Sequence, residues 1–134
     1  MIYLDSRILI YLVERTPKLS ELIERLMTQP PPRRYAISPL VRLECLVGPL
    51  RAGHTSRVEA FQRVFGQFIE LPITREVFDS ATKLRADGAL KTPDAIHLAT
   101  ARRGKCTELW TNDDRLAKAA PGFAVNLKSH LRDW

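Results

Sequence analysis

Short apolar runs alternate with longer amphipathic segments along this chain, and this alternation constrains its fold more than any other feature. Runs suited to buried strands occupy residues 2–5, 35–37, 69–71 and 108–111, with a further one at 123–125. Apolar residues recur at helical spacing in between, for instance in residues 19–26. We expect helices over residues 7–14, 18–28, 39–47, 55–67, 74–86, 93–103 and 114–119. Such alternation predicts an α/β fold: a central parallel sheet of four to five strands, flanked by helices on both faces.

Two of the expected helices have clear starting signals. Ser38-Pro39 and Thr92-Pro93 each place a hydroxyl before a proline. We expect each hydroxyl to be an N-cap, and each proline to take the first helical position, where its missing N–H costs nothing. The first helix should end near Gly48-Pro49, because proline disrupts a helix interior. The second should end at Gly104, a suitable residue just past a helix.

Length, charge and cysteine content narrow the function. A chain of 134 residues fits one domain over 1–134. Lys and Arg number 21 against 15 Asp and Glu, a net charge of +6 that favours a polyanion such as nucleic acid. No segment approaches the ~20 apolar residues of a membrane-spanning helix, and the N-terminus does not resemble a signal peptide. Cys45 and Cys106 stand apart and are expected to be reduced, buried thiols, which indicates the cytoplasm.

Four acidic residues lie just beyond the expected strands or near helix starts: Asp5, Glu44, Asp94 and Asp113. In an open α/β sheet, ligands bind in the crevice outside the carboxyl ends of the strands. Carboxylates that converge there repel one another and need cations or protons. Their oxygen atoms favour Mg²⁺ or Mn²⁺, which can support phosphodiester hydrolysis by polarising a phosphoryl oxygen and activating water. An acidic centre on a basic exterior therefore predicts a metal-dependent nuclease.

Each acid also has a purely structural interpretation. Asp113 or Asp114 can cap a turn, and Asp94 can simply complement a helix dipole. Glu44 has apolar neighbours and can lie at the edge of the core. Asp5, which ends a buried strand, is the hardest to explain structurally.

At these residues the chain resembles PIN-domain proteins, and specifically the VapC-type toxins of bacterial and archaeal toxin–antitoxin pairs. The resemblance covers nearly the whole length and rests on four segments in the family's order: residues 1–6, 38–49, 92–101 and 109–116. It implies a PIN fold and a Mg²⁺- or Mn²⁺-dependent endoribonuclease that cleaves structured or translation-related RNA. It also implies a cognate VapB-type antitoxin and, commonly, a homodimer.

The resemblance assigns roles to particular residues. It implies Asp5, Asp94 and Asp113 as metal ligands and Glu44 as a further catalytic acid. Ser6, Thr111 and Asp114 are the expected supporting residues, and either Asp113 or Asp114 can face the metal. The expected nucleic-acid contacts are Arg7, Arg42, Arg102 and Arg115, of which Arg7 departs from the asparagine that the family often has there.

His97 lies three residues after Asp94 and shares its helix face. A general-base role for His97 stays open, but a structural or surface histidine is favoured.

Three other functions compete with a ribonuclease. A catalytically inactive PIN-like RNA-binding module would gain nothing from four acids that face phosphate. A phosphoacceptor signalling domain also uses acids at strand ends, but it generally pairs two of them at the first strand, whereas Leu4 and Ser6 flank Asp5. A DNA-directed PIN-like nuclease is usually larger. We therefore expect RNA cleavage.

Overall fold

The computed structural model describes residues 1–133 and has the predicted parallel sheet. Its five strands are β1 (Ile2–Leu4), β2 (Tyr35–Ile37), β3 (Ile69–Glu70), β4 (Glu108–Thr111) and β5 (Ala124–Asn126). They lie in the order β3-β2-β1-β4-β5, and every neighbouring pair is parallel. The predicted α/β class is confirmed, with β1 at the centre.

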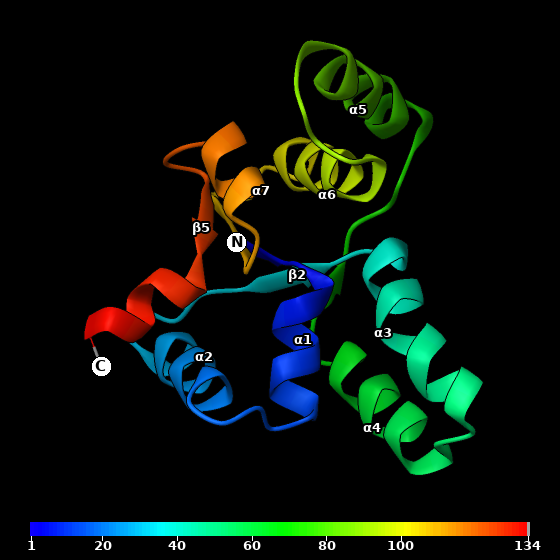
Figure 1. Cartoon of the computed structure of the whole chain (residues 1–134), viewed down its shortest axis with the longest axis vertical. Coiled ribbons are helices and arrows are strands. Elements are labelled where there is room, and N and C mark those ends of the chain that lie inside the picture. The colour runs from blue at the N-terminus through cyan, green and yellow to red at the C-terminus, as the bar shows by residue number, and fades with distance from the viewer. Residues whose placement is uncertain (134) are drawn as a thin grey trace.

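The order of the strands decides where the helices lie. From β1 the chain moves outward through β2 to β3, and then returns to the other side of β1 to add β4 and β5. Because parallel crossovers are right-handed, this reversal sends the helices to opposite faces of the sheet. On one side lie α1 (Ser6–Val13), α2 (Leu19–Thr28), α3 (Pro39–Ala52) and α4 (Thr55–Phe65), and on the other lie α5 (Arg75–Asp87) and α6 (Thr92–Arg103) (Figure 1). The helix α7 (Asp114–Ala119) connects β4 to β5, and a 3₁₀ helix over Leu127–Asp133, which the sequence does not predict, follows β5.

The centre of the sheet is covered on both faces. All three residues of β1 are at most 1% exposed. Residues 95–101 of α6 are buried without interruption, because this helix lies between the sheet and α5. A helix enclosed in this way holds the residues of its first turns in fixed positions at the end of the sheet.

The expectation that α3 ends near Gly48-Pro49 is wrong, because the helix continues to Ala52 and ends at Gly53, where φ is +69°. Pro49 is buried on the same face as Val41 and Cys45, at spacings of four and eight residues. Its packing on this face offsets the cost of a proline inside a helix.

The predicted hydroxyl caps are also wrong. Ser38 occupies the N-cap position of α3, but its side chain makes no capping hydrogen bond. It bonds instead to the Tyr3 hydroxyl, at 2.8 Å. Thr92 is itself the first residue of α6, and Lys91 takes the N-cap position.

Gly104 does follow α6, but for a different reason from the one expected. Its φ of −75° is open to any residue, so left-handed backbone does not require glycine here. A Cβ atom on Gly104 would lie 2.5 Å from Cδ1 of Leu71 and 3.2 Å from the backbone carbonyl oxygen of Thr100, which cannot move aside as a side chain can. Glycine is therefore favoured by close packing.

Cys45 and Cys106 are separate buried thiols, as expected. No helix among the described residues is long and apolar enough to cross a membrane.

Candidate active site

The candidate site lies at the carboxyl ends of β1 and β4, where the strand order reverses. Leu4 and Trp110 are partners in the parallel ladder, so the residues that follow them lie next to each other. The cleft there has a volume of about 270 Å³. Its lining residues are Asp5, Ser6, Arg7, Glu44, Lys91, Pro93, Asp94, Asn112 and Asp113. The structure thus brings the four predicted acids to the crevice where open α/β sheets bind ligands.

Asp5 is held by its neighbours on both strands. Its Oδ2 accepts a hydrogen bond from the Thr111 hydroxyl at 2.7 Å, and its Oδ1 accepts one from Ser6 at 3.2 Å. The backbone N–H of Asp5 donates to the carbonyl of Trp110 at 3.0 Å. Asp5 is only 6% exposed, so its carboxylate has one well-defined position at the floor of the cleft.

The two adjacent acids after β4 have different environments. Asp113 lines the cleft, and its Oδ1 accepts a hydrogen bond from the backbone N–H of Arg115 at 2.8 Å, which caps α7. Asp114 is exposed and accepts a hydrogen bond from the Asn126 amide at 2.6 Å. Asp114 is absent from the cleft lining, so Asp113 is the acid of this pair that the fold brings to the site.

Asp94 lies in the first turn of α6, and its charge is poorly tolerated. Burial, followed by the negative charges of Asp113 and Asp5, raises the pKa of Asp94 to about 6. A bound cation would relieve this repulsion. The pKa of Asp94 is therefore raised partly because several carboxylates lie close together in the cleft.

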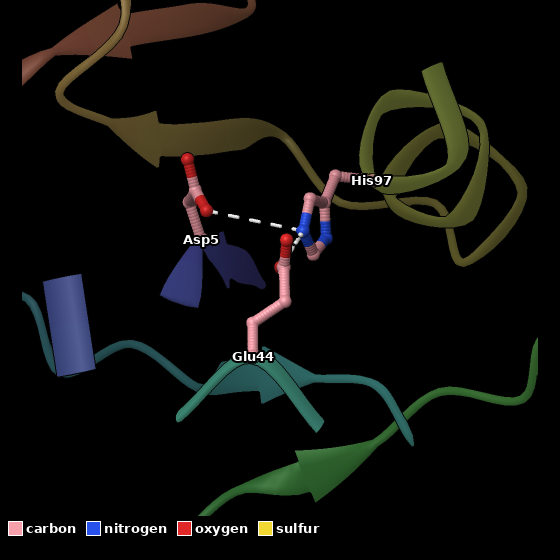
Figure 2. A group of neighbouring side chains, drawn as sticks. All are labelled: Asp5, Glu44 and His97. Atoms are coloured by element: carbon pink, nitrogen blue, oxygen red, sulfur yellow. Dashed lines mark hydrogen bonds and ion pairs between the residues drawn. The ribbon is translucent and has the colours of Figure 1, made fainter. Parts of the chain in front are cut away.

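Glu44 reaches the cleft from α3 and meets His97 from α6 (Figure 2). The Nε2 atom of His97 lies 2.6 Å from Oε1 of Glu44 and 3.9 Å from Oδ1 of Asp5. Burial acts to raise the pKa of Glu44, but the hydrogen bond from His97, together with Ser6 and the charge of Arg7, outweighs it, so the pKa is lowered. His97 is 1% exposed, so of the two favoured interpretations a surface histidine is wrong and a structural histidine stays open.

The donor set fits a divalent metal ion. Ligand atoms of Asp5, Glu44 and His97 all lie within 4.8 Å of one another, and Asp94 and Asp113 line the same cleft. Carboxylate oxygens dominate this set, as expected for a hard cation. An acidic cluster that can hold a metal is thus present, and its chemistry is that of an oxygen-rich site.

The four expected arginine contacts are dispersed. Arg7 lines the cleft. Arg42 pairs with Glu70 and lies over the Phe65 ring, so it is not part of the cleft. Arg102 likewise lies outside the cleft, over the ring of Phe123. Arg115 lines a neighbouring cavity of about 490 Å³ together with Lys118.

Four residues lie in or behind the site although the sequence predicts no role for them there: Tyr3, Ser38, Lys91 and Asn112. Asn112 donates to the Tyr11 hydroxyl at 2.6 Å, and Lys91 precedes α6 at the mouth of the cleft. Their positions near predicted acids along the chain are the signal that could have identified them. Ser38 has no predicted acid so near, and Tyr3, although it lies two residues before Asp5, acts through contacts that form only in the folded protein.

The chain is similar to known proteins in sequence and in fold. Residues 2–121 match the family model of the PIN domain. The chain is 37% identical over 128 residues to "Ribonuclease VapC46" of Mycobacterium tuberculosis, an alignment that covers 92% of this chain and 95% of that protein.

Solved structures show the same similarity. A toxin–antitoxin complex from Klebsiella pneumoniae contains a chain that is 27% identical, with a TM-score of 0.75, over 93% of this chain and 96% of that one. VapBC-1 from nontypeable Haemophilus influenzae shares the fold at 18% identity, with a TM-score of 0.73, over 96% of this chain and 99% of that one. The chain therefore belongs to the PIN-domain family, and within it to the VapC-type toxins.

Proposed function

We propose that this VapC-type protein is a metal-dependent endoribonuclease that hydrolyses phosphodiester bonds of structured or translation-related RNA, as one domain over residues 1–134. One observation carries the proposal: Asp5, Glu44, Asp94 and Asp113 come from separate parts of the chain and meet in one cleft. The name of the Mycobacterium tuberculosis relative, a ribonuclease, supports the reaction class. The net charge of +6 supports a polyanionic substrate.

The cofactor that we propose is Mg²⁺ or Mn²⁺. Asp5, Asp94 and Asp113 would hold it, with Glu44 as a further acid at the site. When bound, such an ion polarises a phosphoryl oxygen and lowers the pKa of water. Repulsion among the carboxylates, visible in the raised pKa of Asp94, supports a cation as the natural occupant.

The residues of the cleft position the reacting groups. Hydrolysis adds the hydroxyl of water to phosphorus and breaks the bond from phosphorus to the leaving ribose oxygen, which gains the proton. Thr111 and Ser6 fix the Asp5 carboxylate through hydrogen bonds, so its orientation is set before the substrate binds. Arg7 and Lys91 place positive charge along the same cleft, where a phosphate would lie.

The cavity beside the cleft is a suitable place for a neighbouring nucleotide. Leu84 and Leu90 contribute apolar walls, and Arg115 and Lys118 contribute cations with no ion pair among the described residues. A base can lie against the apolar side chains while the cations contact its phosphate. We assign this cavity to the RNA-binding surface.

Partners follow from the same family membership. Toxin–antitoxin complexes among the structural relatives support an antitoxin partner, and we propose that it is a cognate VapB-type protein. We further propose a homodimer in the cytoplasm. Leu43, Val47 and Leu50 of α3 form an apolar row at helical spacing, exposed at 62%, 43% and 63%, and this row is the candidate contact between subunits.

The decisive experiment is cleavage of a mixed cellular RNA pool by purified, antitoxin-free protein with Mg²⁺, with Mn²⁺ and with EDTA. Asp5→Asn and Asp94→Ala should each abolish metal-dependent cleavage while the far-UV circular dichroism spectrum stays unchanged. Asp79→Asn, which changes an exposed carboxylate on α5, is the matched control and should cleave normally. RNA that stays intact with the folded wild-type protein under every condition would favour the RNA-binding module instead.

A further inference from the structure

A row of buried side chains, joined by hydrogen bonds, runs from the protein core to the cleft. The Ser38 hydroxyl lies 2.8 Å from the Tyr3 hydroxyl, which lies 2.6 Å from Nδ1 of His97. On the other side of the ring, Nε2 lies 2.6 Å from Oε1 of Glu44. Ser38 and Tyr3 are completely buried, and His97 is 1% exposed. The row therefore connects α3, β1 and α6 behind the acids.

With a neutral His97 ring, the direction of every hydrogen bond in the row follows from its outer end. An ionised Glu44 carboxylate only accepts, so Nε2 of His97 must donate to it. In a neutral imidazole this leaves Nδ1 as an acceptor, and the Tyr3 hydroxyl donates to it. The oxygen of Tyr3 then accepts from Ser38. Each donor is used once, and the row fixes His97 in the tautomer that carries its proton on Nε2.

Forming this row has a cost in the local stability of α3 and of the core around Tyr3. Ser38 occupies the N-cap position of α3 yet bonds to Tyr3 in place of the helix, although a capping hydroxyl would stabilise that helix. Tyr3 buries its hydroxyl at the centre of the sheet, where such a group is tolerated only with a partner. A phenylalanine would fill the same space without this requirement. These choices indicate that the row serves the site at its outer end.

We propose that His97 is a positioning residue, which holds the Glu44 carboxylate beside Asp5 for metal binding and is itself held by Tyr3 and Ser38. Its Nε2–H lies between the two acids, 2.6 Å from one and 3.9 Å from the other (Figure 2). The donor bond orients Glu44, and its polarity moderates the repulsion of Glu44 by Asp5. This inference rests on the proposed metal site, but it does not depend on which RNA is cleaved.

A metal-ligating His97 is the alternative, and it predicts the opposite tautomer. If Nε2 bound the metal directly, it would have no proton to give Glu44, and Nδ1 would donate to Tyr3. The two arrangements differ in which ring nitrogen carries the proton. Nitrogen-15 NMR of the His97 ring in the wild-type protein distinguishes them with no substitution, in the metal-free state and with Mg²⁺. The positioning role predicts protonated Nε2 in both states, and a transfer of the proton to Nδ1 with Mg²⁺ would overturn it.

Variants provide an independent test through the Mn²⁺ affinity, measured by isothermal titration calorimetry. Tyr3→Phe should preserve the fold and weaken Mn²⁺ binding by about tenfold, the lower end of the effect typical of residues that support metal ligands. His97→Leu should weaken it at least as much. His97→Gln should recover part of the loss, because its amide N–H can replace Nε2–H as a donor to Glu44.

The outcomes separate this inference from the proposed nuclease activity. Mn²⁺ affinity unchanged in both Tyr3→Phe and His97→Leu would overturn the positioning role, whether or not the wild type cleaves RNA. Equal losses in His97→Gln and His97→Leu would overturn it in favour of direct ligation. A wild-type protein that binds Mn²⁺ and responds to these variants but leaves RNA intact would reject the nuclease and retain the positioning role.

Discussion

Asp5 and Asp94 line one acidic cleft, but the contacts of their carboxylates differ. Asp5 accepts hydrogen bonds from Ser6 and Thr111, which fix the orientation of its carboxylate. Burial and the charges of Asp113 and Asp5 instead raise the pKa of Asp94 to about 6. Without metal, the folded protein therefore disfavours the ionised form of Asp94, and the charge of this residue is one that a bound cation would stabilise.

We predict that Asp94→Asn stabilises the metal-free protein at pH 7.5 but not at pH 4. Because the pKa of Asp94 is higher in the folded chain than the ordinary value of 3.8, the native state binds the proton more tightly than the unfolded state. The resulting stability is present at low pH and is lost as the pH rises through about 6. Asparagine carries no charge and avoids this loss. At pH 7.5 the gain in the free energy of unfolding should be about 1 kcal/mol, reduced because solvent reaches this half-buried group.

Urea denaturation in EDTA at both pH values measures this difference. The exposed Asp79→Asn variant should change stability little at either pH. The same gain for Asp94→Asn at pH 4 and at pH 7.5 would show that its cause is not the charge of Asp94.

Asp113 and Asp114 provide a second test at the residue scale. Asp113→Asn should abolish RNA cleavage and weaken Mn²⁺ binding, because it removes a carboxylate from the cleft. An asparagine can still cap α7, so the fold should survive. Asp114→Asn should retain near-normal cleavage rates, since Asp114 contacts Asn126 outside the cleft. The reverse result would assign the metal to Asp114.

The residues that could be predicted from the sequence are those whose chemistry is visible without partners. Asp5 and Asp113 follow expected strands, and a carboxylate at such a position suggests a ligand site whatever else the chain does. His97 and Tyr3 matter through contacts over 53 and 94 positions of sequence. Neither the burial of the His97 ring nor the partners of its nitrogen atoms can be predicted from local spacing. The sequence alone therefore favours a structural or surface histidine at position 97.

At the scale of elements, the alternation of strands and helices is predictable, but their ends depend on tertiary contacts. β1 and α6 lie within a residue or so of their expected positions, because clear apolar patterns and a proline define them. The end of α3 differs from the expected one because local propensity disfavours Pro49, whereas packing of its buried face keeps the helix intact. Ser38 fails as a cap for a similar reason, since Tyr3 competes for its hydroxyl.

The extension of α3 past Pro49 leads to a prediction about two glycines. Gly48 lies inside the helix and is exposed, and apart from its chain neighbours and the helix backbone nothing lies within 4 Å of where a Cβ would be. Gly48→Ala should therefore raise the free energy of unfolding by less than the usual gain of about 0.5–1 kcal/mol from replacing glycine in a helix, because the ring of Pro49 crowds a Cβ on the residue before it.

Gly53→Ala is the matched control at the end of the same helix. Its φ of +69° strains any residue with a Cβ, so this variant should lower stability by about 1 kcal/mol. Thermal or urea unfolding of both variants checks the pair. If Gly53→Ala is as stable as the wild type, α3 does not end in a left-handed residue at position 53.

At the scale of the whole molecule, the site results from the order of the strands in the sheet. The chain reverses its direction of growth at β1, so helices leave β1 and β4 toward opposite faces and a crevice opens between them. Asp5 and Asp113 lie at that crevice because they follow these two strands, and α3 and α6 bring Glu44 and Asp94 to it. The fold class is predictable from the pattern of elements, but the packing that brings four acids within one small cleft depends on contacts that no local pattern specifies.

The proposed homodimer gives a prediction for the assembled protein. Replacing Leu43 and Leu50 with glutamate places two charges on the exposed apolar row of α3. Light scattering after size exclusion should then change from the mass of two chains to that of one. Phe78→Glu is the control, because it alters an exposed apolar residue on α5 and should leave the dimer intact. If the double variant keeps the mass of the wild type, this row is not the contact between subunits.

Charge on the molecular surface leads to the last prediction, which concerns RNA affinity in the presence of EDTA. If cations around the cleft bind phosphates, the logarithm of the association constant should fall linearly with the logarithm of salt concentration, because binding releases counterions. Replacing Arg115 and Lys118 together with alanine should reduce that slope by about 1.4, since each phosphate that a cation neutralises on a single strand contributes about 0.7. Arg75→Ala, at an exposed position that lines neither cavity, should leave the slope unchanged. Fluorescence anisotropy with a labelled RNA measures all three proteins. If the slope is the same in the double variant and the wild type, the cavity beside the cleft is not part of the RNA-binding surface. Arg7 and Lys91 would then be the cations that bind the substrate.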